Sequence, residues 1–393
     1  MRMRKTTATL AGFLLVGIAA TPAHAESIRS RQWHLTLMKA DQIWKTSTGA
    51  GITVAVIDGG VAPIPELEGQ VVPGKDFATT YSGDERTDSN QHGTAMAALI
   101  AGTGKHPSGD GAFGLAPGAK ILPIRVPEGV DVKNAAWTAA IRYAADTDAK
   151  IISISLASGE EDPARLDAVK YALSKGKLIF AGVGNRGDGS NEVLYPAATP
   201  GVVGVGAVDS GGKATAESEH GAQVDLTAPG ADIVTACSGK TGVCKGSGTS
   251  NATALASASA ALIWSAHPGW TNNQVLRVMM NTAGKPIDGA ERSDFLGYGT
   301  VRPRTAVPNP GDPGPADVYP IPDLAAAGGG TGTKAPSAPS STAPSDQAAP
   351  APQAEAKADG GGSGSLPWLA LGLGACVLIG GAVTAVALRR RSR

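Results

Sequence analysis

Three residues of the chain, Asp58, His92 and Ser250, have the types and the local contexts needed for nucleophilic catalysis. A serine hydroxyl is a poor nucleophile near neutral pH, so it needs an imidazole to accept its proton and a carboxylate to hold that imidazole in the right tautomer. Asp58 follows the apolar residues 54–57, His92 opens a His-Gly-Thr block, and Ser250 ends a Gly-Thr-Ser block. The sequence therefore predicts a hydrolase in which Ser250 attacks, His92 transfers protons and Asp58 orients the imidazole.

The elements that must position these residues alternate between buried strands and amphipathic helices. Nearly unbroken apolar runs, which parallel sheets covered on both faces require, predict strands at residues 52–57, 120–126, 151–156, 178–183 and 202–208. Helices are expected at residues 93–103, 132–146, 163–175, 250–266 and 272–282. The alternation predicts an α/β fold with a mostly parallel central sheet. Alanines after Ser250 would let its helix pack close to that sheet, and the first helical turn favours a developing oxyanion.

Both ends of the chain carry signals that direct it to a membrane. Residues 1–25 join a basic start, an apolar stretch and a terminal Ala-His-Ala site, which predicts a signal peptide removed before Glu26. Residues 366–388 contain no charge and would reach roughly 35 Å as a helix, enough for a hydrocarbon core of about 30 Å. Arginines in residues 389–393 predict a cytoplasmic tail. We therefore expect a single-pass protein of the cell membrane whose folded domain is extracytoplasmic.

Composition divides the exported chain into three parts. Residues 26–50 form a leader that is expected to wrap the domain, and residues 51–307 form the folded domain itself. Residues 308–365 are rich in Pro, Gly and Ala and have too few large apolar residues to fold, which predicts a disordered linker. Lys and Arg total 34, as do Asp and Glu, so net charge provides no attraction to nucleic acid. No nucleic-acid partner is expected.

Two of the three cysteines lie close together in the folded domain. In an oxidising compartment Cys237 and Cys244 would pair as a disulfide that stiffens the segment before Ser250, with two free thiols as the alternative. The third, Cys376, lies in the expected membrane span. The charged residues 84–88 form either a calcium loop or a solvated loop, and they lack a regular ligand pattern. No metal and no other cofactor is predicted.

The order Asp, His, Ser, with spacings of 34 and 158 residues, resembles that of the subtilisin-like serine peptidases. The blocks at residues 93–103, 114–120, 195–198 and 227–230 are similar to blocks of that family. The resemblance covers residues 32–307, and it implies a three-layer subtilisin-like fold that cleaves polypeptides through an acyl-enzyme.

The resemblance also implies further site residues. Asn185, in a Gly-rich turn, would bind the tetrahedral oxyanion together with the Ser250 backbone N–H; a left-handed loop residue is the alternative for such an Asn. An extended substrate would lie between two walls and pair with their backbones as an added strand. One wall is formed by Ser155, Leu156 and Ala157, and the other by Gly182, Val183 and Gly184.

The layout of signal peptide, leader, peptidase domain, Pro-rich linker and membrane span is similar to that of the mycosins, membrane-anchored peptidases associated with type VII secretion. This implies polypeptide substrates exported by such a system and association with its membrane complex. The chain departs from the usual subtilisin pattern at Gly59, Ala95, Asn251 and Ala254, none of which removes a proton-transfer group. The departures leave open a second hypothesis, in which a catalytically weak or inactive peptidase fold stabilises the secretion complex as a scaffold.

Overall fold

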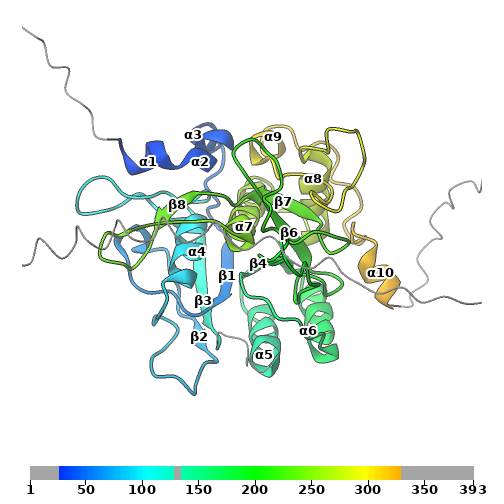
Figure 1. Ribbon diagram of the computed structural model, residues 1–393, viewed down its shortest axis with the longest axis horizontal. Coiled ribbons are helices and arrows are strands. Elements are labelled where there is room, and N and C mark those ends of the chain that lie inside the picture. The colour runs from blue at the N-terminus through cyan, green and yellow to red at the C-terminus, as the bar shows by residue number, and fades with distance from the viewer. Residues whose placement is uncertain (1–25, 128–133, 329–393) are drawn as a thin grey trace, which may run out of the picture. The chain divides into compact units, whose positions relative to one another are not determined.

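A parallel β-sheet forms the middle layer of the molecule (Figure 1). The structure is a computed structural model that describes residues 26–127 and 134–328. Within that part of the chain the main sheet has seven strands in the order β2-β3-β1-β4-β5-β6-β7, and all neighbouring pairs are parallel. The strands are β1 (Thr53–Asp58), β2 (Lys75–Asp76), β3 (Lys120–Arg125), β4 (Ile151–Ile154), β5 (Leu178–Gly182), β6 (Val203–Val208) and β7 (Leu226–Pro229).

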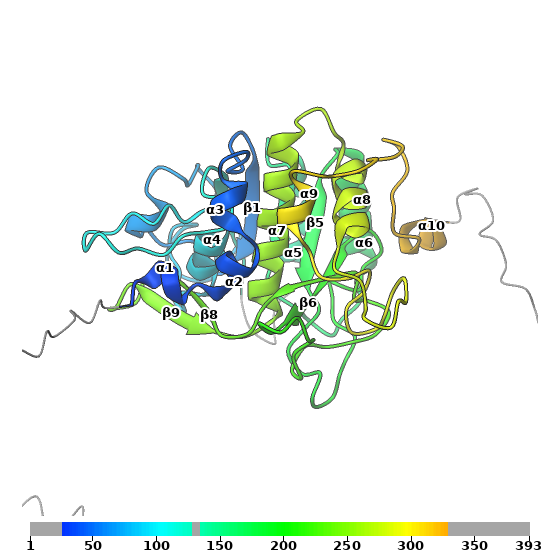
Figure 2. The ribbon, with the colours of Figure 1, turned by 90° about the horizontal axis from the view of Figure 1, so that it is seen from above.

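Helices cover both faces of this sheet (Figures 1 and 2). One face is covered by α4 (His92–Ala101), α7 (Thr249–Ala266) and α8 (Asn272–Thr282), and the other by α5 (Asn134–Ala145) and α6 (Pro163–Ser174). Successive strand residues point to opposite faces, so Val54 and Val56 of β1 join one core while Ala55 and Ile57 join the other. The expected three-layer arrangement is confirmed, and the predicted strands and helices agree with the structure to within two residues at each end, except that residues 132 and 133, the predicted start of one helix, lie outside the described residues.

A two-stranded antiparallel hairpin, which the sequence analysis did not predict, lies outside the main sheet. It is formed by β8 (Ile233–Ala236) and β9 (Val243–Gly246). The structure joins Cys237 and Cys244 as a disulfide across the turn of this hairpin, with 5.8 Å between their Cα atoms. The remaining short helices of the described domain are η1 (Pro65–Leu67) and α9 (Pro303–Ala306).

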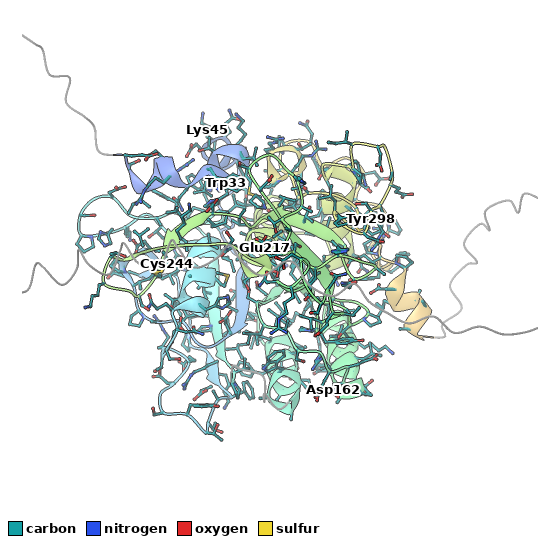
Figure 3. The ribbon with its side chains drawn as sticks, in the orientation of Figure 1. Trp33, Lys45, Asp162, Glu217, Cys244 and Tyr298 are labelled. Carbon is teal, nitrogen blue, oxygen red and sulfur yellow. A yellow bond between two sulfur atoms is a disulfide. The ribbon has the colours of Figure 1, made fainter. Side chains whose placement is uncertain are left out.

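The leader wraps the domain as three short helices, α1 (Ile28–Arg31), α2 (Trp33–Leu37) and α3 (Ala40–Ile43). Leu35 is fully buried in the core that contains α4 and α7. The Gln32 side chain binds both backbone groups of Phe113, donating from Nε2 to the carbonyl at 2.7 Å and accepting from the N–H at 3.0 Å. The Trp33 indole, labelled in Figure 3, donates to the Ala231 carbonyl at 3.1 Å. These contacts make the leader a part of the folded domain.

His34 of α2 makes the docked leader sensitive to acid. The ring is 0% exposed, and neither ring nitrogen has a hydrogen-bond partner among the described residues. Burial, together with the nearby Arg29 charge, lowers the pKa of His34 to about 3. Since the unfolded chain binds the proton more readily, the stability that the neutral ring provides is complete above about pH 6.5 and falls as the pH drops toward 3.

We therefore expect the free energy of unfolding to be about 2 kcal/mol lower at pH 5 than at pH 7 through this group alone. Urea denaturation at the two pH values measures the difference. A His34→Leu variant should lose most of it, whereas His106→Ala, which changes a histidine at the surface, should keep it. Equal pH dependence in the wild type and the His34→Leu variant would contradict this account.

The C-terminal boundary of the folded domain is a correction to the sequence analysis. Residues 308–328, expected to begin the disordered linker, pack onto the domain and end in α10 (Asp323–Gly328). The Tyr319 hydroxyl donates to the Gly201 carbonyl at 3.0 Å, and Ile321 is buried. The Arg277 guanidinium donates to the carbonyl oxygens of Pro313, Pro315 and Val318. Composition did not reveal this anchoring because it depends on backbone carbonyls and only two large side chains.

The other predicted segments lie outside the described residues. They are the signal peptide of residues 1–25, the rest of the linker, the membrane span of residues 366–388 and the tail of residues 389–393. Among the helices that the structure does describe, none has the length and apolar character needed to cross a bilayer.

Candidate active site

The predicted site residues gather at one edge of the sheet, where the carboxyl ends of the parallel strands meet. Asp58 is the last residue of β1, Ser155 follows the neighbouring strand β4, and Asn185 follows β5. His92 and Ser250 lie in the first turns of α4 and α7, two helices that pack against each other on the same face. This edge is the usual position of ligand sites in open parallel sheets.

Asp58 and His92 form a hydrogen-bonded pair whose carboxylate is buried. The Nδ1 atom of His92 lies 2.9 Å from Oδ1 and 3.0 Å from Oδ2 of Asp58. The Asp58 side chain is fully buried, whereas the His92 side chain is 32% exposed. The Gly59 N–H also donates to Asp58 Oδ1, at 2.8 Å. A carboxylate that accepts from Nδ1–H fixes the tautomer in which Nε2 can take a proton.

Local contacts determine where α4 begins. Asp88 accepts from the Gln91 N–H at 2.9 Å and from the Thr94 N–H and hydroxyl at 2.8 and 2.6 Å, which satisfies free donors of the first turn. Gly93 has no side chain to separate α4 from β1. A Cβ there would collide with the Gly60 carbonyl oxygen and would lie 2.9 Å from the Asp58 Cβ. Only Gly therefore allows His92 to approach Asp58 this closely.

A Gly93→Ala substitution is expected to push the start of α4 away from β1 and to lower kcat/KM by roughly 10²-fold, because small misplacements of catalytic groups are that costly. The matched control is Gly269→Ala, since an added Cβ at Gly269 has open space around it. Steady-state hydrolysis of a peptide substrate by both variants measures the effect. Unchanged activity of Gly93→Ala would show that the close approach is not needed.

Asn185 is held by the first turn of α7. Its Oδ1 accepts from the Thr249 N–H at 2.8 Å and lies 3.2 Å from the Thr249 hydroxyl. Because a backbone N–H can only donate, the atom that faces it must be the amide oxygen of Asn185. The Nδ2 NH₂ group, which can only donate, is therefore on the other side of the side-chain amide. An exposed residue oriented in this way can donate to a negative charge that develops next to Ser250.

The first proposed wall of the substrate groove lies directly beside Ser250. The Ser250 hydroxyl donates to the Ser155 carbonyl oxygen at 3.3 Å, and the Ser155 hydroxyl is 3.4 Å from the Ser250 carbonyl oxygen. Leu156 is half-buried and Ala157 is exposed, so both are accessible to a ligand.

The second proposed wall offers a surface and few free backbone groups. Val183 is buried, and its N–H donates to Val205 at 3.1 Å, while the Gly184 N–H lies 3.3 Å from the Thr249 hydroxyl. Gly182 is also buried. The N–H groups of Val183 and Gly184 are thus already used, so a substrate strand along this wall would pair through other backbone groups. Both walls stay predictions.

The disulfide hairpin contacts the segment before His92 and the start of α7, where Ser250 lies. Cys244 Sγ lies 3.9 Å from Oε1 of Gln91, the residue before His92. Asn251, one of the departures from the subtilisin pattern, donates to the Gly246 carbonyl at 3.1 Å and to the Gly230 carbonyl at 3.3 Å. The hairpin thus braces the segment before His92 in addition to the expected one before Ser250. Sequence reasoning missed this contact because nothing in the sequence links the hairpin to Gln91.

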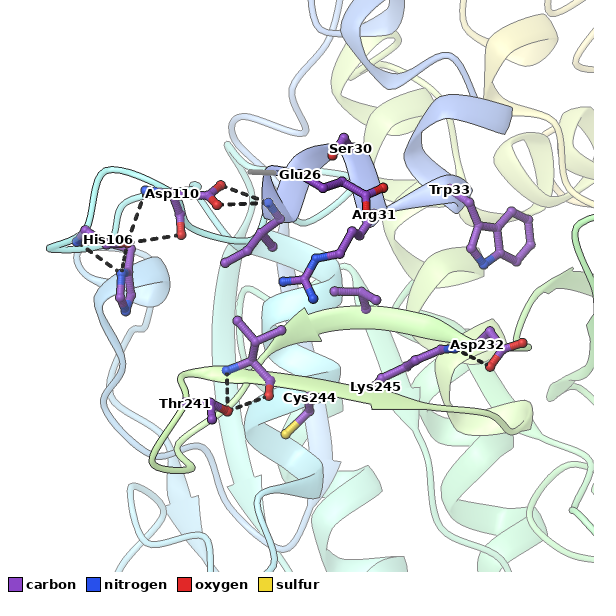
Figure 4. A pocket seen from close by; sticks show the side chains of 14 residues that line it. Glu26, Ser30, Arg31, Trp33, His106, Asp110, Asp232, Thr241, Cys244 and Lys245 are labelled. Carbon is purple, nitrogen blue, oxygen red and sulfur yellow. Dashed lines mark hydrogen bonds and ion pairs between the residues drawn. The ribbon is translucent and has the colours of Figure 1, made fainter. Parts of the chain in front are cut away.

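A groove of about 980 Å³ lies between α1, the loop around His106 and the β8–β9 hairpin (Figure 4). Asp110 in this groove accepts the Ile28 N–H at 2.9 and 3.0 Å, and Lys245 forms an ion pair with Asp232 at 2.8 Å. None of Asp58, His92, Asn185 and Ser250 lines the groove. It therefore belongs to the docking of the leader and not to catalysis.

Comparison with known proteins agrees with this geometry. Residues 49–300 match the model of the peptidase S8 group, described as the subtilase family. The chain belongs to the subtilase family. Thermitase of Thermoactinomyces vulgaris is 34% identical over 260 residues, which cover 65% of this chain and 89% of thermitase. A thermophilic serine proteinase of Bacillus sp. (strain AK1) is also 34% identical, over 68% of this chain and 64% of that proteinase.

Among solved structures, MycP1 of Mycobacterium smegmatis is similar with a TM-score of 0.64 and 27% identity over 76% of this chain and 89% of MycP1. MycP3, a protease from the type VII (ESX-3) secretion system, is similar with a TM-score of 0.62 and 32% identity over 73% and 90% of the two chains. The predicted subtilisin-like fold and the resemblance to mycosins are confirmed. This subtilase is a serine endopeptidase of subtilisin type, related to the mycosins.

Proposed function

We propose that this subtilase is a membrane-anchored, extracytoplasmic endopeptidase that processes proteins of a type VII secretion system. In this proposal Ser250 is the nucleophile, His92 the general base and acid, Asp58 the residue that orients His92, and Asn185 an oxyanion donor. The observation that carries the proposal is the hydrogen-bonded pair of His92 with the buried Asp58, at the sheet edge where α7 begins with Ser250 in its first turn.

The reaction follows from these positions. The Ser250 hydroxyl turns its proton from the Ser155 carbonyl toward Nε2 of His92 and attacks the scissile carbonyl carbon. The Nδ2 NH₂ group of Asn185 and the Ser250 backbone N–H stabilise the oxyanion of the tetrahedral intermediate. His92 then gives the proton to the leaving amine, which departs and leaves an acyl-enzyme on Ser250. Water, activated by His92 in the same way, releases the acid product and restores the hydroxyl.

The departures from the subtilisin pattern are compatible with catalysis. Gly59 still donates its N–H to Asp58, and Asn251 fastens the start of α7 to Gly246 of the hairpin and to Gly230 before it. Neither residue separates Asp58 from His92. The geometry therefore supports an active peptidase over the inactive scaffold.

A secretion assay separates the peptidase from the scaffold. In a strain that carries the Ser250→Ala protein at wild-type abundance, the type VII substrate should no longer be cleaved. This holds whether or not export of the substrate depends on its cleavage. Mass spectrometry of the substrate termini measures the processing directly. Continued cleavage of the substrate in that strain would contradict the proposed function, because another enzyme would then be responsible.

The membrane anchor is supported by the apolar residues 366–388, by the basic tail and by the signal sequence. The full chain should stay in the membrane fraction after extraction with alkaline carbonate, and a chain that ends at residue 365 should appear in the soluble exported fraction. Release of the full chain by carbonate, or membrane retention of the shortened chain, would overturn the anchor. The folded domain should be degraded by protease added outside spheroplasts.

A further inference from the structure

A short segment at residues 217–220 lies under the oxyanion loop, which we define as residues 184–191. The Glu219 N–H donates to the Gly184 carbonyl at 3.1 Å, and the Gly187 N–H donates to the Glu217 carbonyl at 2.9 Å. Asn185 lies between these two attachment points. Glu217 is labelled in Figure 3. The position of Asn185, the proposed oxyanion donor, thus depends on the backbone contacts of the loop with residues 217–219 and on its own hydrogen bond with Thr249.

The segment is itself fixed on the sheet and at the far end of the loop. The Ser218 hydroxyl accepts the Ala207 N–H of β6 at 3.0 Å. The His220 N–H donates to Asn191 Oδ1 at 2.9 Å, and Asn191 Nδ2 donates to the His220 carbonyl at 3.1 Å. The loop therefore rests on a rigid support, so a change in that support reaches Asn185.

The Glu219 side chain is the unusual part of this support. Glu219 is 1% exposed, and among the described residues neither carboxyl oxygen has a hydrogen-bond partner of good geometry. Its Oε2 lies so close to Gly184 that any Cβ at that position would collide with it. The Glu219 carboxyl group therefore packs directly against Gly184, the residue before Asn185, and leaves no room for a side chain at position 184.

The charged groups that face Glu219 come from the oxyanion loop and the residues just after it. Burial raises the pKa of Glu219 to about 7; the approaching Arg186 backbone N–H lowers it, Glu192 raises it further, and the Arg186 charge lowers it. On its own segment Glu219 is flanked by Glu217 and His220. The carboxyl is thus neutral in mild acid, and it ionises close to neutral pH.

We propose that Glu219 is a positioning residue for the oxyanion loop: its neutral carboxyl holds Gly184 and Asn185 in the catalytic position, and its ionisation displaces them. This inference rests on the proposed role of Asn185. It assigns to the enzyme an alkaline limit that is separate from the proton transfers of His92.

The displacement follows from the charges around the carboxyl. An ionised carboxylate cannot remain unpaired in a dry site, so it must gain water or a cation. The cation whose charge acts on Glu219 is Arg186, an exposed side chain on the residue directly after Asn185. Movement of Arg186 toward Glu219, together with repulsion from Glu192, would carry the Asn185 amide away from the oxyanion. The loss would appear in kcat, since Asn185 acts on the transition state and not on substrate binding.

The test is the pH profile of kcat and KM for a peptide substrate, measured with the full chain in detergent. In the wild type, kcat should fall roughly 10-fold or more from pH 7 to pH 9.5 while KM stays within about twofold, because a misplaced oxyanion donor costs 10² or more. Glu219→Gln and Glu219→Leu, which cannot ionise, should both keep kcat constant over this range.

Two controls distinguish this role from a general loss of structure. Asp225→Asn changes another buried carboxyl, whose pKa burial raises to about 8 and which accepts the Gly204 N–H and not an N–H of the loop; it should leave the alkaline fall in kcat unchanged. In an Asn185→Ala background the fall should vanish even with Glu219 present. An alkaline fall that persists in both Glu219 variants, or in Asn185→Ala, would overturn the inference. A fall that is absent in Asn185→Ala but present in both Glu219 variants would assign the loop a different titrating group, which would also overturn it.

Discussion

Replacement of Ser250 by Ala is expected to lower kcat for peptide hydrolysis by about 10⁶-fold with little change in KM, because the nucleophile is lost while the substrate groove remains. His92→Ala should lose about as much, and Asp58→Ala less, about 10⁴-fold. The double variant Ser250→Ala/His92→Ala should lose no more than either single one, since residues that act as a unit are not additive.

Steady-state kinetics of the purified chain measure these losses, and circular dichroism checks that each variant is folded. Ser265→Ala is the matched control, because Ser265 is in the same helix, α7, with its hydroxyl donating to the Ala50 carbonyl. Multiplied effects in the double variant would mean that Ser250 and His92 act independently, which is incompatible with proton transfer between them.

Asn185 gives the second large effect, and two substitutions separate its two roles. Asn185→Ala should lower kcat by about 10² to 10³ by removing the oxyanion donor. It should also lower stability by about 1 kcal/mol, because Oδ1 of Asn185 accepts the Thr249 N–H at the start of α7. Asn185→Asp keeps an oxygen that can accept from the Thr249 N–H but loses the NH₂ donor.

The Asp variant should therefore be as slow as the Ala variant while retaining the stability of the wild type. Kinetics and thermal denaturation of the two proteins measure this difference. Asn273→Ala is the control, since that exposed amide on α8 donates to the Ala316 carbonyl. An Asn185→Asp protein with wild-type kcat would show that the side-chain NH₂ group of Asn185 does not contribute to catalysis.

The sequence predicted most of the sheet because its strands have strong local signals, and it proposed the candidate site residues from equally local blocks. Apolar runs such as residues 178–183 locate strands buried on both faces, and the His-Gly-Thr and Gly-Thr-Ser blocks single out His92 and Ser250 as candidates. The contact of Asp58 with His92 was predicted from types and order, and the structure places the two residues at hydrogen-bonding distance.

The remaining features depend on tertiary contacts that leave no local pattern. Residues 308–328 appeared too poor in apolar side chains to fold, but their backbone carbonyls are bound by Arg277. Glu219 lies in a polar stretch of the sequence that gives no sign of its burial in the fold. The β8–β9 hairpin has one buried strand and one exposed strand, which periodicity alone did not separate from a loop.

The central claim is that the fold makes one serine a nucleophile by placing it within reach of an imidazole that Asp58 orients. Labelling with a fluorophosphonate, followed by peptide mapping in a mass spectrometer, tests this claim most directly. One modified residue, Ser250, is expected in the wild-type protein, with labelling at least 10³-fold slower in His92→Ala, on the order of the loss expected for a broken triad. Modification of a different serine, or labelling of Ser250 at the same rate without His92, would contradict it.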